Sequence, residues 1–294
     1  MKLITPNYYQ KFKCIADRCR HNCCIGWEID IDEETDAYYR GVQGSMGARL
    51  QKSISRNDTP HFILGSGERC PFLNENNLCD IITALGEEHL CQICTDHPRF
   101  RNEFSDRIEL GLGLCCEEAC ALILSQKEPF SLMEPDETEH QSEEEQTFFT
   151  IRDRIFQLLQ NRSQPIKKRL SHLLALFQIE IPTLDWQSVF FDLERLDPIW
   201  DSKIARIDLH AAIPEEWSLP LEQLTVYFIY RHLAGALEDG RYAARCAFAV
   251  LSVKVIASVA ASVEDLPEIA RHYSSEIEYS DENVKLLLDK LTQG

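Results

Sequence analysis

Cysteine is the residue type in this sequence whose number and spacing could support chemistry. The chain has 12 cysteines in 294 residues, and all except Cys246 lie within its first 120 residues. They form short groups: Cys14-x4-Cys19-x3-Cys23-Cys24, Cys70-x8-Cys79, Cys91-x2-Cys94 and a final set of Cys115, Cys116 and Cys120. Because turn-sized segments join the thiols of each group, we expect them to converge in the folded chain on disulfides or on a metal.

The expected compartment favours a metal. Polar residues and proline between Met1 and Asn7 interrupt the sequence before an apolar signal segment could form, so we expect a cytoplasmic protein. Cysteine-dense segments in the reducing cytosol are more often metal-binding or catalytic than disulfide-bonded. The pattern therefore predicts a metal centre.

Thiolates are soft ligands that suit zinc, copper(I) or iron–sulfur clusters. The predicted ligands are Cys14, Cys19, Cys23, Cys24, Cys70, Cys79, Cys91, Cys94 and Cys116. Since one tetrahedral zinc takes four ligands, this set predicts two metal sites or one cluster surrounded by several loops. His21 and His97 leave a mixed Cys/His zinc site open, although a surface or packing role is favoured for both because the thiols suffice. Cys246 is interpreted as a buried core side chain.

Composition and charge narrow the function classes. With 44% hydrophobic and 27% charged residues, the chain has the composition of a soluble protein that is long enough for two domains. The net charge of −18 argues against nucleic-acid binding, which needs a surplus of Lys and Arg, and either favours a basic partner or aids solubility. The apolar segment Cys246–Val263 carries Lys254 and is rich in Ala and Ser, so it predicts a buried helix and no membrane span.

The predicted fold class is α+β, with a small cysteine-rich metal-binding N-terminal domain followed by an all-helical domain. The acidic run Glu134–Gln146 has no aliphatic or aromatic side chain and indicates a linker. The expected domains are therefore residues 1–133 and 148–294, joined by the linker 134–147.

Local patterns predict the elements of both domains. Alternation indicates strands at Glu28–Asp32 and Ile108–Leu114, the Asn-rich centre of Cys70–Cys79 indicates a turn, and Ile81–Leu90 looks helical. Apolar residues recur at helical spacing in three later segments, 151–158, 170–177 and 284–291, and Ser280 is placed to cap the last of these helices.

The run from Tyr8 to Trp27, which contains the first cysteine group, resembles the start of the flagellin lysine-N-methylase family. That family belongs to a wider group of cysteine-cluster domains described as zinc- or iron-chelating. The likeness spans most of the chain and continues through Cys70–Leu73, Leu78–Ile81, Gly86–Cys94, Pro98–Phe100, Leu114–Ala119, Tyr227–His232 and Tyr279–Asn283. The chain departs from the pattern at His97, where the family has an aromatic residue, at Cys115 and Cys120, where it has Ser and Ala, and at Glu117, where it has Pro. We therefore leave Cys115 and Cys120 out of the ligand set.

The resemblance implies a protein lysine N-methyltransferase that transfers methyl groups from S-adenosylmethionine to surface lysines of flagellin or another protein. It also implies a [4Fe-4S] cluster as the metal, with zinc as the alternative. A lysine amine has a free pKa of about 10.4, so a site must desolvate it or supply a base before the nitrogen can attack. Asp96, Tyr38 and Tyr39 are considered as contributors, and no residue is assigned as catalytic or cofactor-binding.

Two other functions remain open at this stage. The thiols could hold structural zinc in a non-enzymatic protein-interaction module, or the chain could be an electron-transfer or metal-handling protein. Spacing alone identifies no reaction, because the glycines at Gly41, Gly44 and Gly47 do not form a dinucleotide fingerprint and Gly26 stands where a radical S-adenosylmethionine motif would need cysteine.

Overall fold

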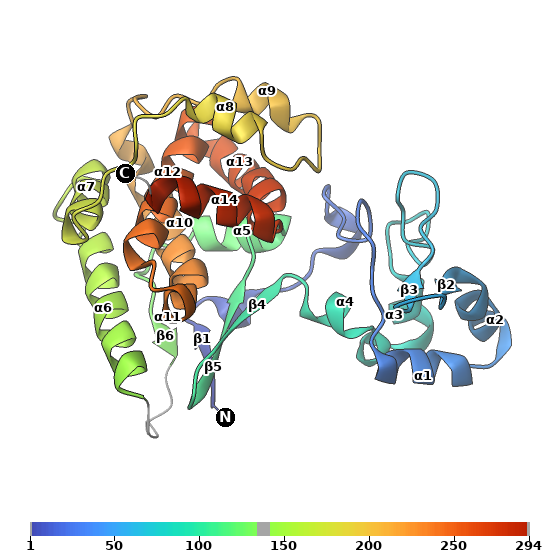
Figure 1. Ribbon diagram of the computed structural model, residues 1–294. Coiled ribbons are helices and arrows are strands. Elements are labelled where there is room, and N and C mark those ends of the chain that lie inside the picture. The colour runs from blue at the N-terminus through green and yellow to red at the C-terminus, as the bar shows by residue number, and fades with distance from the viewer. Residues whose placement is uncertain (1, 134–141, 293–294) are drawn as a thin grey trace. The chain divides into compact units, whose positions relative to one another are not determined.

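The computed structural model describes residues 2–133 and 142–292. The chain forms two compact units, Lys13–Arg99 and a second unit made of Met1–Phe12 together with Phe100–Gly294 (Figure 1). This division differs from the predicted domains 1–133 and 148–294. The reason is that the first strand and the segment after residue 100 pack with the later helices and share one hydrophobic core with them.

The predicted linker 134–147 lies only partly in the described structure. Residues 134–141 fall outside the described residues, and Ser142 begins helix α6 (Glu143–Leu159). Ser142 and Glu145 form a reciprocal capping box, in which the serine hydroxyl accepts from the Glu145 N–H at 3.1 Å. Such a box satisfies free backbone donors at the start of a helix, so the last acidic residues of the predicted linker, Glu143–Glu145, form the first turn of a helix.

The unit Lys13–Arg99 consists of short elements joined by long loops. They are helices α1 (Glu33–Gly41), α2 (Gly44–Ser53), α3 (Asp80–Leu85) and α4 (Gln92–Asp96), strands β2 (Ile54–Ser55) and β3 (His61–Phe62), and 3-10 turns at Ala16–Arg18 and Glu87–His89. Its small core contains Ile29, Tyr39, Leu50, Phe62 and Phe72. Cys70 and Cys91 are buried in the same core.

Two local predictions in this unit were wrong in detail. Glu28–Asp32 forms no strand: it buries Ile29 and Ile31 as its alternation predicts, but only Asp30 makes a β-bridge, with His61. The helix expected over Ile81–Leu90 ends at Leu85, because Gly86 adopts φ +105°, a backbone conformation that glycine accepts and a helix cannot continue through.

The second unit contains a four-stranded sheet. In the order β4-β5-β1-β6, its strands are Arg99–Glu103, Arg107–Leu112, Lys2–Pro6 and Leu132–Met133. Strand β1 runs parallel to β5, with Lys2 opposite Arg107, and antiparallel to β6. The strand predicted over Ile108–Leu114 is therefore confirmed as far as Leu112.

From Ser142 onward the described residues contain helices without strands, which confirms the all-helical prediction for this part and the α+β class. The helices are α6, α7 (Ile166–Leu176), α8 (Trp186–Phe191), α9 (Trp200–Ile204), α10 (Ser218–His232), α11 (Ala236–Asp239), α12 (Tyr242–Val259), α13 (Leu266–Tyr273) and α14 (Asp281–Thr292), with α5 (Glu117–Leu124) before them. Short turns of 3-10 helix lie at Tyr9–Lys11, Glu215–Trp217, Leu233–Gly235 and Val263–Asp265, and a π-helical turn lies at Ser274–Glu278.

Helix α12 occupies the centre of this unit. In the described residues it is the one helix that is long and apolar enough to cross a membrane, and 67% of it is buried inside the protein. It packs between α10 and α14 (Figure 1). The prediction of a buried helix over Cys246–Val263 is confirmed as far as Val259. The cap on α14 is confirmed too, since the Ser280 hydroxyl accepts from the Asn283 N–H at 3.2 Å.

Candidate functional site

All twelve cysteines lie in the described residues, and each is a free thiol. Six of the nine predicted ligands interact with one another in the unit Lys13–Arg99: Cys23, Cys24, Cys70, Cys79, Cys91 and Cys94. Two pairs are hydrogen-bonded through their side chains, Cys23 with Cys24 and Cys91 with Cys94. Three separate cysteine groups of the sequence thus meet in one unit.

Backbone pairing brings these groups together. The Cys70 N–H donates to the Cys24 carbonyl at 2.8 Å, and the Gly26 N–H donates to the Glu68 carbonyl at 3.1 Å. Gly26 has φ +93°, a conformation that side chains disfavour, and this lets the chain turn sharply after the Cys23-Cys24 pair. The residue that breaks the radical S-adenosylmethionine spacing is therefore part of the turn that joins two cysteine groups.

The segment Cys70–Cys79 folds back on itself as predicted. Leu73 and Cys79 form an antiparallel bridge, and the Asn74 side chain accepts from the N–H groups of Asn76 and Leu78 at 2.9 and 3.0 Å. Asn74 also donates to Asp80 at 2.8 Å at the start of α3. The asparagines therefore shape the turn between the two thiols.

Hydrogen bonds between neighbouring thiols, together with burial and charge, give these cysteines different pKa values. Hydrogen bonding from Cys24 lowers the pKa of Cys23 to about 7, and the same bond, together with burial and the charges of nearby thiolates, raises the pKa of Cys24. Cys91 and Cys94 show the same pattern, with the pKa of Cys91 lowered by Cys94 and that of Cys94 raised. Burial raises the pKa of Cys70 to about 11.

The other three predicted ligands are placed differently. Cys14 is exposed, and its sulfur accepts from the Ala16 N–H at 3.4 Å, whereas the Cys19 thiol donates to the His21 carbonyl at 3.3 Å. Cys116 belongs to the second unit, where it is the N-cap residue of α5. Among the described residues, no three Cys, His, Asp or Glu side chains are arranged as a metal-binding group. The donor set nevertheless fits a soft metal by its chemistry, since six thiols share one small unit.

The other residues considered from the sequence have structural contacts. Tyr39 is fully buried and donates to the His89 carbonyl at 2.7 Å, and burial, with the nearby thiolates of Cys91, Cys94 and Cys79, raises its pKa. Tyr38 stacks on the His89 ring at 4.2 Å between centroids, and Asp96 accepts from Gln92 at 2.8 Å. These contacts position the helices of the unit.

His97 is half-buried beside the Trp27 ring, at 6.4 Å between centroids. Burial, with the charge of Arg99, lowers the pKa of His97 to about 4, so the ring is neutral at physiological pH. This setting agrees with the packing role favoured for His97 from the sequence.

Asp32 is a positioning residue that sequence reasoning missed. It caps α1 by accepting from the Thr35 N–H at 2.9 Å, and its other oxygen accepts from the Gln92 N–H at 2.8 Å at the start of α4. Burial alone would raise the pKa of Asp32, but these hydrogen bonds lower it. Because Cys91 is the N-cap residue of α4, Asp32 holds the helix that carries the Cys91–Cys94 pair. An Asp before Glu-Glu-Thr is a helix-start signal that could have been read from the sequence.

A second candidate site lies in the other unit, around a buried ion pair between Arg231 and Glu278. The Arg231 Nε lies 3.4 Å from Glu278 Oε1, and His232 Nε2 lies 2.6 Å from the same oxygen. The Tyr227 hydroxyl donates to Glu278 and accepts from Arg231 at 2.9 Å. Burial would raise the pKa of Glu278, yet Arg231 and His232 lower it, and burial lowers the pKa of His232. The group therefore consists of a carboxylate, a guanidinium and a neutral imidazole.

Three segments that carry the family resemblance meet at this group. Tyr227 accepts from the Leu114 N–H at 3.3 Å, Tyr279 hydrogen-bonds Cys115, and the Arg231 guanidinium lies 5.0 Å from the centre of the Tyr279 ring. Burial, opposed by the contacts with Tyr279 and Arg231, raises the pKa of Cys115 to about 12. The runs that begin at Leu114, Tyr227 and Tyr279 are thus neighbours, although more than 160 residues separate the first from the last.

A cavity of about 480 Å³ opens over this group. Its walls come from strand β4, helices α10, α12 and α14, the residue before α12 and the π-helical turn Ser274–Glu278. The lining residues are Phe100, Arg101, Asn102, Arg231, His232, Arg241, Arg245, Glu278, Asp281, Val284, Lys285 and Leu288. Five of these side chains are Arg or Lys and two are carboxylates, in a chain whose net charge is −18. We call this cavity the arginine pocket.

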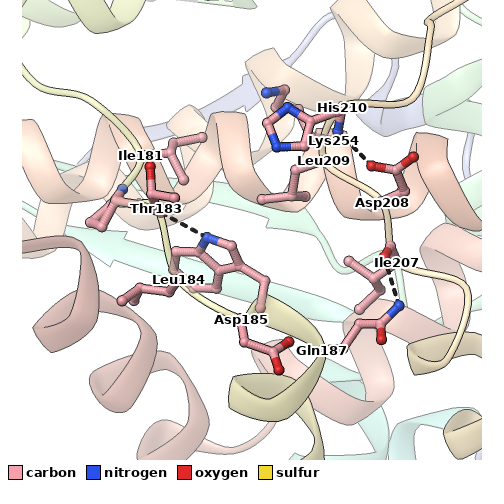
Figure 2. A pocket seen from close by; sticks show the side chains of 12 residues that line it. Ile181, Thr183, Leu184, Asp185, Gln187, Ile207, Asp208, Leu209, His210 and Lys254 are labelled. Carbon is pink, nitrogen blue, oxygen red and sulfur yellow. Dashed lines mark hydrogen bonds between the residues drawn. The ribbon is translucent and has the colours of Figure 1, made fainter.

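A smaller pocket of about 260 Å³ lies elsewhere in the same unit, between the segments around Trp186 and Leu209 (Figure 2). The Trp186 indole donates to the Pro182 carbonyl at 3.0 Å, and Gln187 donates to the Ile207 carbonyl at 3.0 Å. Burial, with the charge of Lys167, lowers the pKa of Lys254 in its wall. The arginine pocket is larger and has more charged side chains in its lining, so it is the stronger candidate for binding a ligand.

The chain is similar to proteins named for lysine methylation and for the flagellum. Over 253 residues it is 25% identical to a lysine-N-methylase of Salmonella typhimurium and to one of Salmonella choleraesuis, and each match covers 82% of this chain and 59% of the relative. It is 29% identical over 145 residues to the flagellar biosynthetic protein FliU of Salmonella muenchen, which covers 46% of this chain and 85% of that protein. The resemblance drawn from the cysteine motifs is therefore confirmed.

The chain spans about three fifths of the length of the lysine-N-methylases that it matches, because 59% of each is covered. No family model matches the chain, and no solved structure matches it.

Proposed function

We propose that this chain acts in protein lysine N-methylation, with S-adenosylmethionine as methyl donor and flagellin or another flagellar protein as substrate. We further propose that its clustered cysteines bind a metal centre, a [4Fe-4S] cluster with zinc as the alternative. The supporting observation is that six thiols from three sequence groups interact within one unit of a chain that is similar to lysine-N-methylases.

Those six thiols are the main proposed ligands of the metal centre. Burial of Cys70 and Cys91 at 5% and 1% exposure limits solvent access to the centre, and Asp32 holds the α4 helix that follows Cys91. Cys14 and Cys19 are further proposed ligands in the same unit, and Cys116 is a separate proposed ligand in the second unit. When bound, an iron–sulfur cluster supplies a redox-active centre whose potential depends on burial and on hydrogen bonds to sulfur.

Methyl transfer to lysine requires that the protein favour the neutral form of the lysine amine. The amine nitrogen forms a bond to the methyl carbon while the carbon–sulfur bond of the sulfonium breaks, and the nitrogen releases one proton. The products are methyllysine, S-adenosylhomocysteine and that proton. Since the free amine has a pKa of about 10.4, its surroundings must favour the neutral form, and desolvation does so. Tyr39 is kept protonated by burial, so its role here is positioning.

The test of the metal centre is the metal content of single variants. We expect Cys91→Ala and Cys94→Ala to lose iron, sulfide and visible absorption after anaerobic purification, because each removes one thiol from the interacting set. Cys246→Ala is the matched control, since Cys246 is fully buried in α12 within the other unit. Unchanged metal in both variants would exclude Cys91 and Cys94 as ligands.

The test of the reaction is methylation of co-expressed flagellin, measured as methyl mass increments on lysine. The wild-type chain should methylate it, and Cys91→Ala should lose this activity. Full methylation by protein that contains zinc and no iron would exclude the iron–sulfur cluster. Absence of methylation by fully metal-loaded wild-type protein would contradict the proposed reaction itself.

A further inference from the structure

The segment that joins α8 to α9 exposes apolar side chains to solvent (Figure 1). Phe191, Leu196 and Ile199 lie within nine consecutive residues and are 45%, 61% and 66% exposed. Their neighbours Phe190 and Trp200 are buried, so the segment has apolar side chains on its inner side and on its outer side. Exposed apolar side chains gathered in one place are typical of a surface that another protein covers. We call the exposed side of residues 191–201 the α8–α9 surface.

Two buried polar side chains hold the backbone of this segment. Glu276 is 2% exposed and accepts from the N–H groups of Leu196 and Asp197 at 2.9 and 2.8 Å. Asn283 is also 2% exposed, and its side chain accepts from the Glu194 N–H at 2.8 Å and donates to the Glu194 carbonyl at 3.1 Å. Because these bonds fix the backbone before a partner arrives, less conformational entropy is lost when the partner binds.

Arg195 connects the two ends of the segment. Its guanidinium lies 5.9 Å from the centre of the Phe191 ring, donates to the Phe191 carbonyl at 3.1 Å and forms an ion pair with Asp201 on α9. Ile199 is the N-cap residue of the same helix. The end of α8 and the start of α9 are therefore neighbours, and their exposed apolar side chains belong to one surface.

The charge around these side chains is negative. Residues 185–201 have a formal net charge of −4, since Arg195 is the one cation against five carboxylates, those of Asp185, Asp192, Glu194, Asp197 and Asp201. Extending the count to residues 180–210 leaves the net charge at −4, because it adds two carboxylates and two cations: Glu180, Asp208, Lys203 and Arg206. Apolar side chains bordered by carboxylates complement a protein segment whose apolar residues are flanked by lysine or arginine.

We propose that the α8–α9 surface binds a lysine-bearing segment of the protein substrate. The apolar side chains of that segment contact Phe191, Leu196 and Ile199, and its lysines lie near Asp192 and Glu194. This inference rests on the proposed function, which supplies a protein substrate with surface lysines, and it adds the surface that holds this substrate. A docking surface makes no bond in the reaction, so its loss raises KM and leaves kcat unchanged.

The experiment is fluorescence-anisotropy titration of labelled monomeric flagellin with the metal-loaded full chain. We expect Leu196→Ser and Ile199→Ser each to weaken binding by about tenfold or more, the effect of losing one buried aliphatic side chain. Asp192→Asn should weaken binding less and should reduce its dependence on salt, because an exposed charge at the edge of an interface acts through a screened field. In methylation assays, Leu196→Ser should raise KM for flagellin with kcat unchanged.

The matched control is Leu3→Ser, which removes a leucine that is 63% exposed on β1 of the same compact unit. It should bind flagellin like wild type, and thermal unfolding checks that all variants are folded. Two helical peptides, one of leucine and lysine and one of leucine and glutamate, test the charge. The lysine peptide should bind and should weaken as salt rises, whereas the glutamate peptide should not bind.

The outcomes separate this inference from the proposed function. Equal affinity of flagellin for wild type, Leu196→Ser and Ile199→Ser would overturn the docking surface, while methylation by the wild-type chain would still support the reaction. Self-association of the chain that Leu196→Ser abolishes would show that a second copy covers the surface, and would overturn the inference as well. Flagellin binding that depends on Leu196, without any methylation, would support the docking surface and contradict the proposed function.

Discussion

Glu109→Gln should be among the most destabilising single changes in the second unit. Glu109 on β5 and Arg152 on α6 form a two-pronged ion pair, with distances of 2.5 and 2.8 Å and side-chain exposures of 0% and 2%. Arg152 also lies 5.2 Å from the Phe148 ring centre and 5.9 Å from that of Tyr230. The substitution keeps the size of the side chain but leaves a buried guanidinium without its counter-charge.

The expected cost follows from that burial. Removing one partner of a buried pair typically costs about 3–5 kcal/mol, because the remaining charge stays desolvated. For a unit of this size each kcal/mol lowers the melting temperature by about 2–4 °C, so the expected drop is roughly 6–20 °C. Replacing both residues, Glu109→Leu with Arg152→Leu, should cost less than Glu109→Gln, since no unpaired charge is left.

Thermal unfolding and urea titration of the full chain, followed by circular dichroism, measure this change. The control is Arg154→Gln, an exposed arginine on the same helix, which should shift stability by no more than about 0.5 kcal/mol. A cost below about 1 kcal/mol for Glu109→Gln would refute the reasoning, because it would mean that the pair is solvated or that Arg152 finds another partner.

Three further changes test other parts of the structure. His232 faces Glu278, Arg231 and Arg245, and burial lowers its pKa. The neutral His232 ring therefore contributes stability above the usual histidine pKa near ~6.5, and this contribution is lost as the pH falls below that value. His232→Gln should therefore flatten the fall in melting temperature between about pH 6.5 and 5, and an unchanged slope would contradict this. Asp32→Ala should lower the free energy of unfolding by at least the ~0.5–2 kcal/mol of a lost helix cap. It should also lower the metal content, because Asp32 holds α4 as well. Urea titration measures the first effect and elemental analysis the second. Leu50→Ala, at a fully buried core position, should cost about 2–5 kcal/mol in urea titration, and a smaller loss would show that the cysteine-rich unit repacks easily.

The elements predicted correctly from the sequence are those whose signals are local. Helical spacing located α6, α7 and α14, the asparagines located the turn before Cys79, and alternation located β5. The boundary of the units could not be predicted in this way. It depends on β1 pairing with β5, a contact between residues more than 100 positions apart, and nothing in the composition of either strand identifies its partner.

Prediction of the candidate sites from the sequence was likewise limited to local signals. The thiols within each cysteine group could be predicted to lie close together, because turn-sized segments join them, but the meeting of separate groups could not. The arginine pocket could not be predicted, because Phe100, Arg231, Arg241 and Lys285 come from four separate segments that only the tertiary fold brings together. Its residues were visible in the sequence only as parts of the runs Tyr227–His232 and Tyr279–Asn283 that carry the resemblance.

The cysteines of the two units show why spacing alone does not assign ligands. Cys120 and Cys246 are fully buried in the apolar core of the second unit. In the other unit the six main proposed ligands have further thiols as neighbours. The same residue type therefore serves as core in one unit and as the proposed ligand in the other. The surroundings that decide between these roles, apolar packing or further thiols, depend on how the groups converge in the fold.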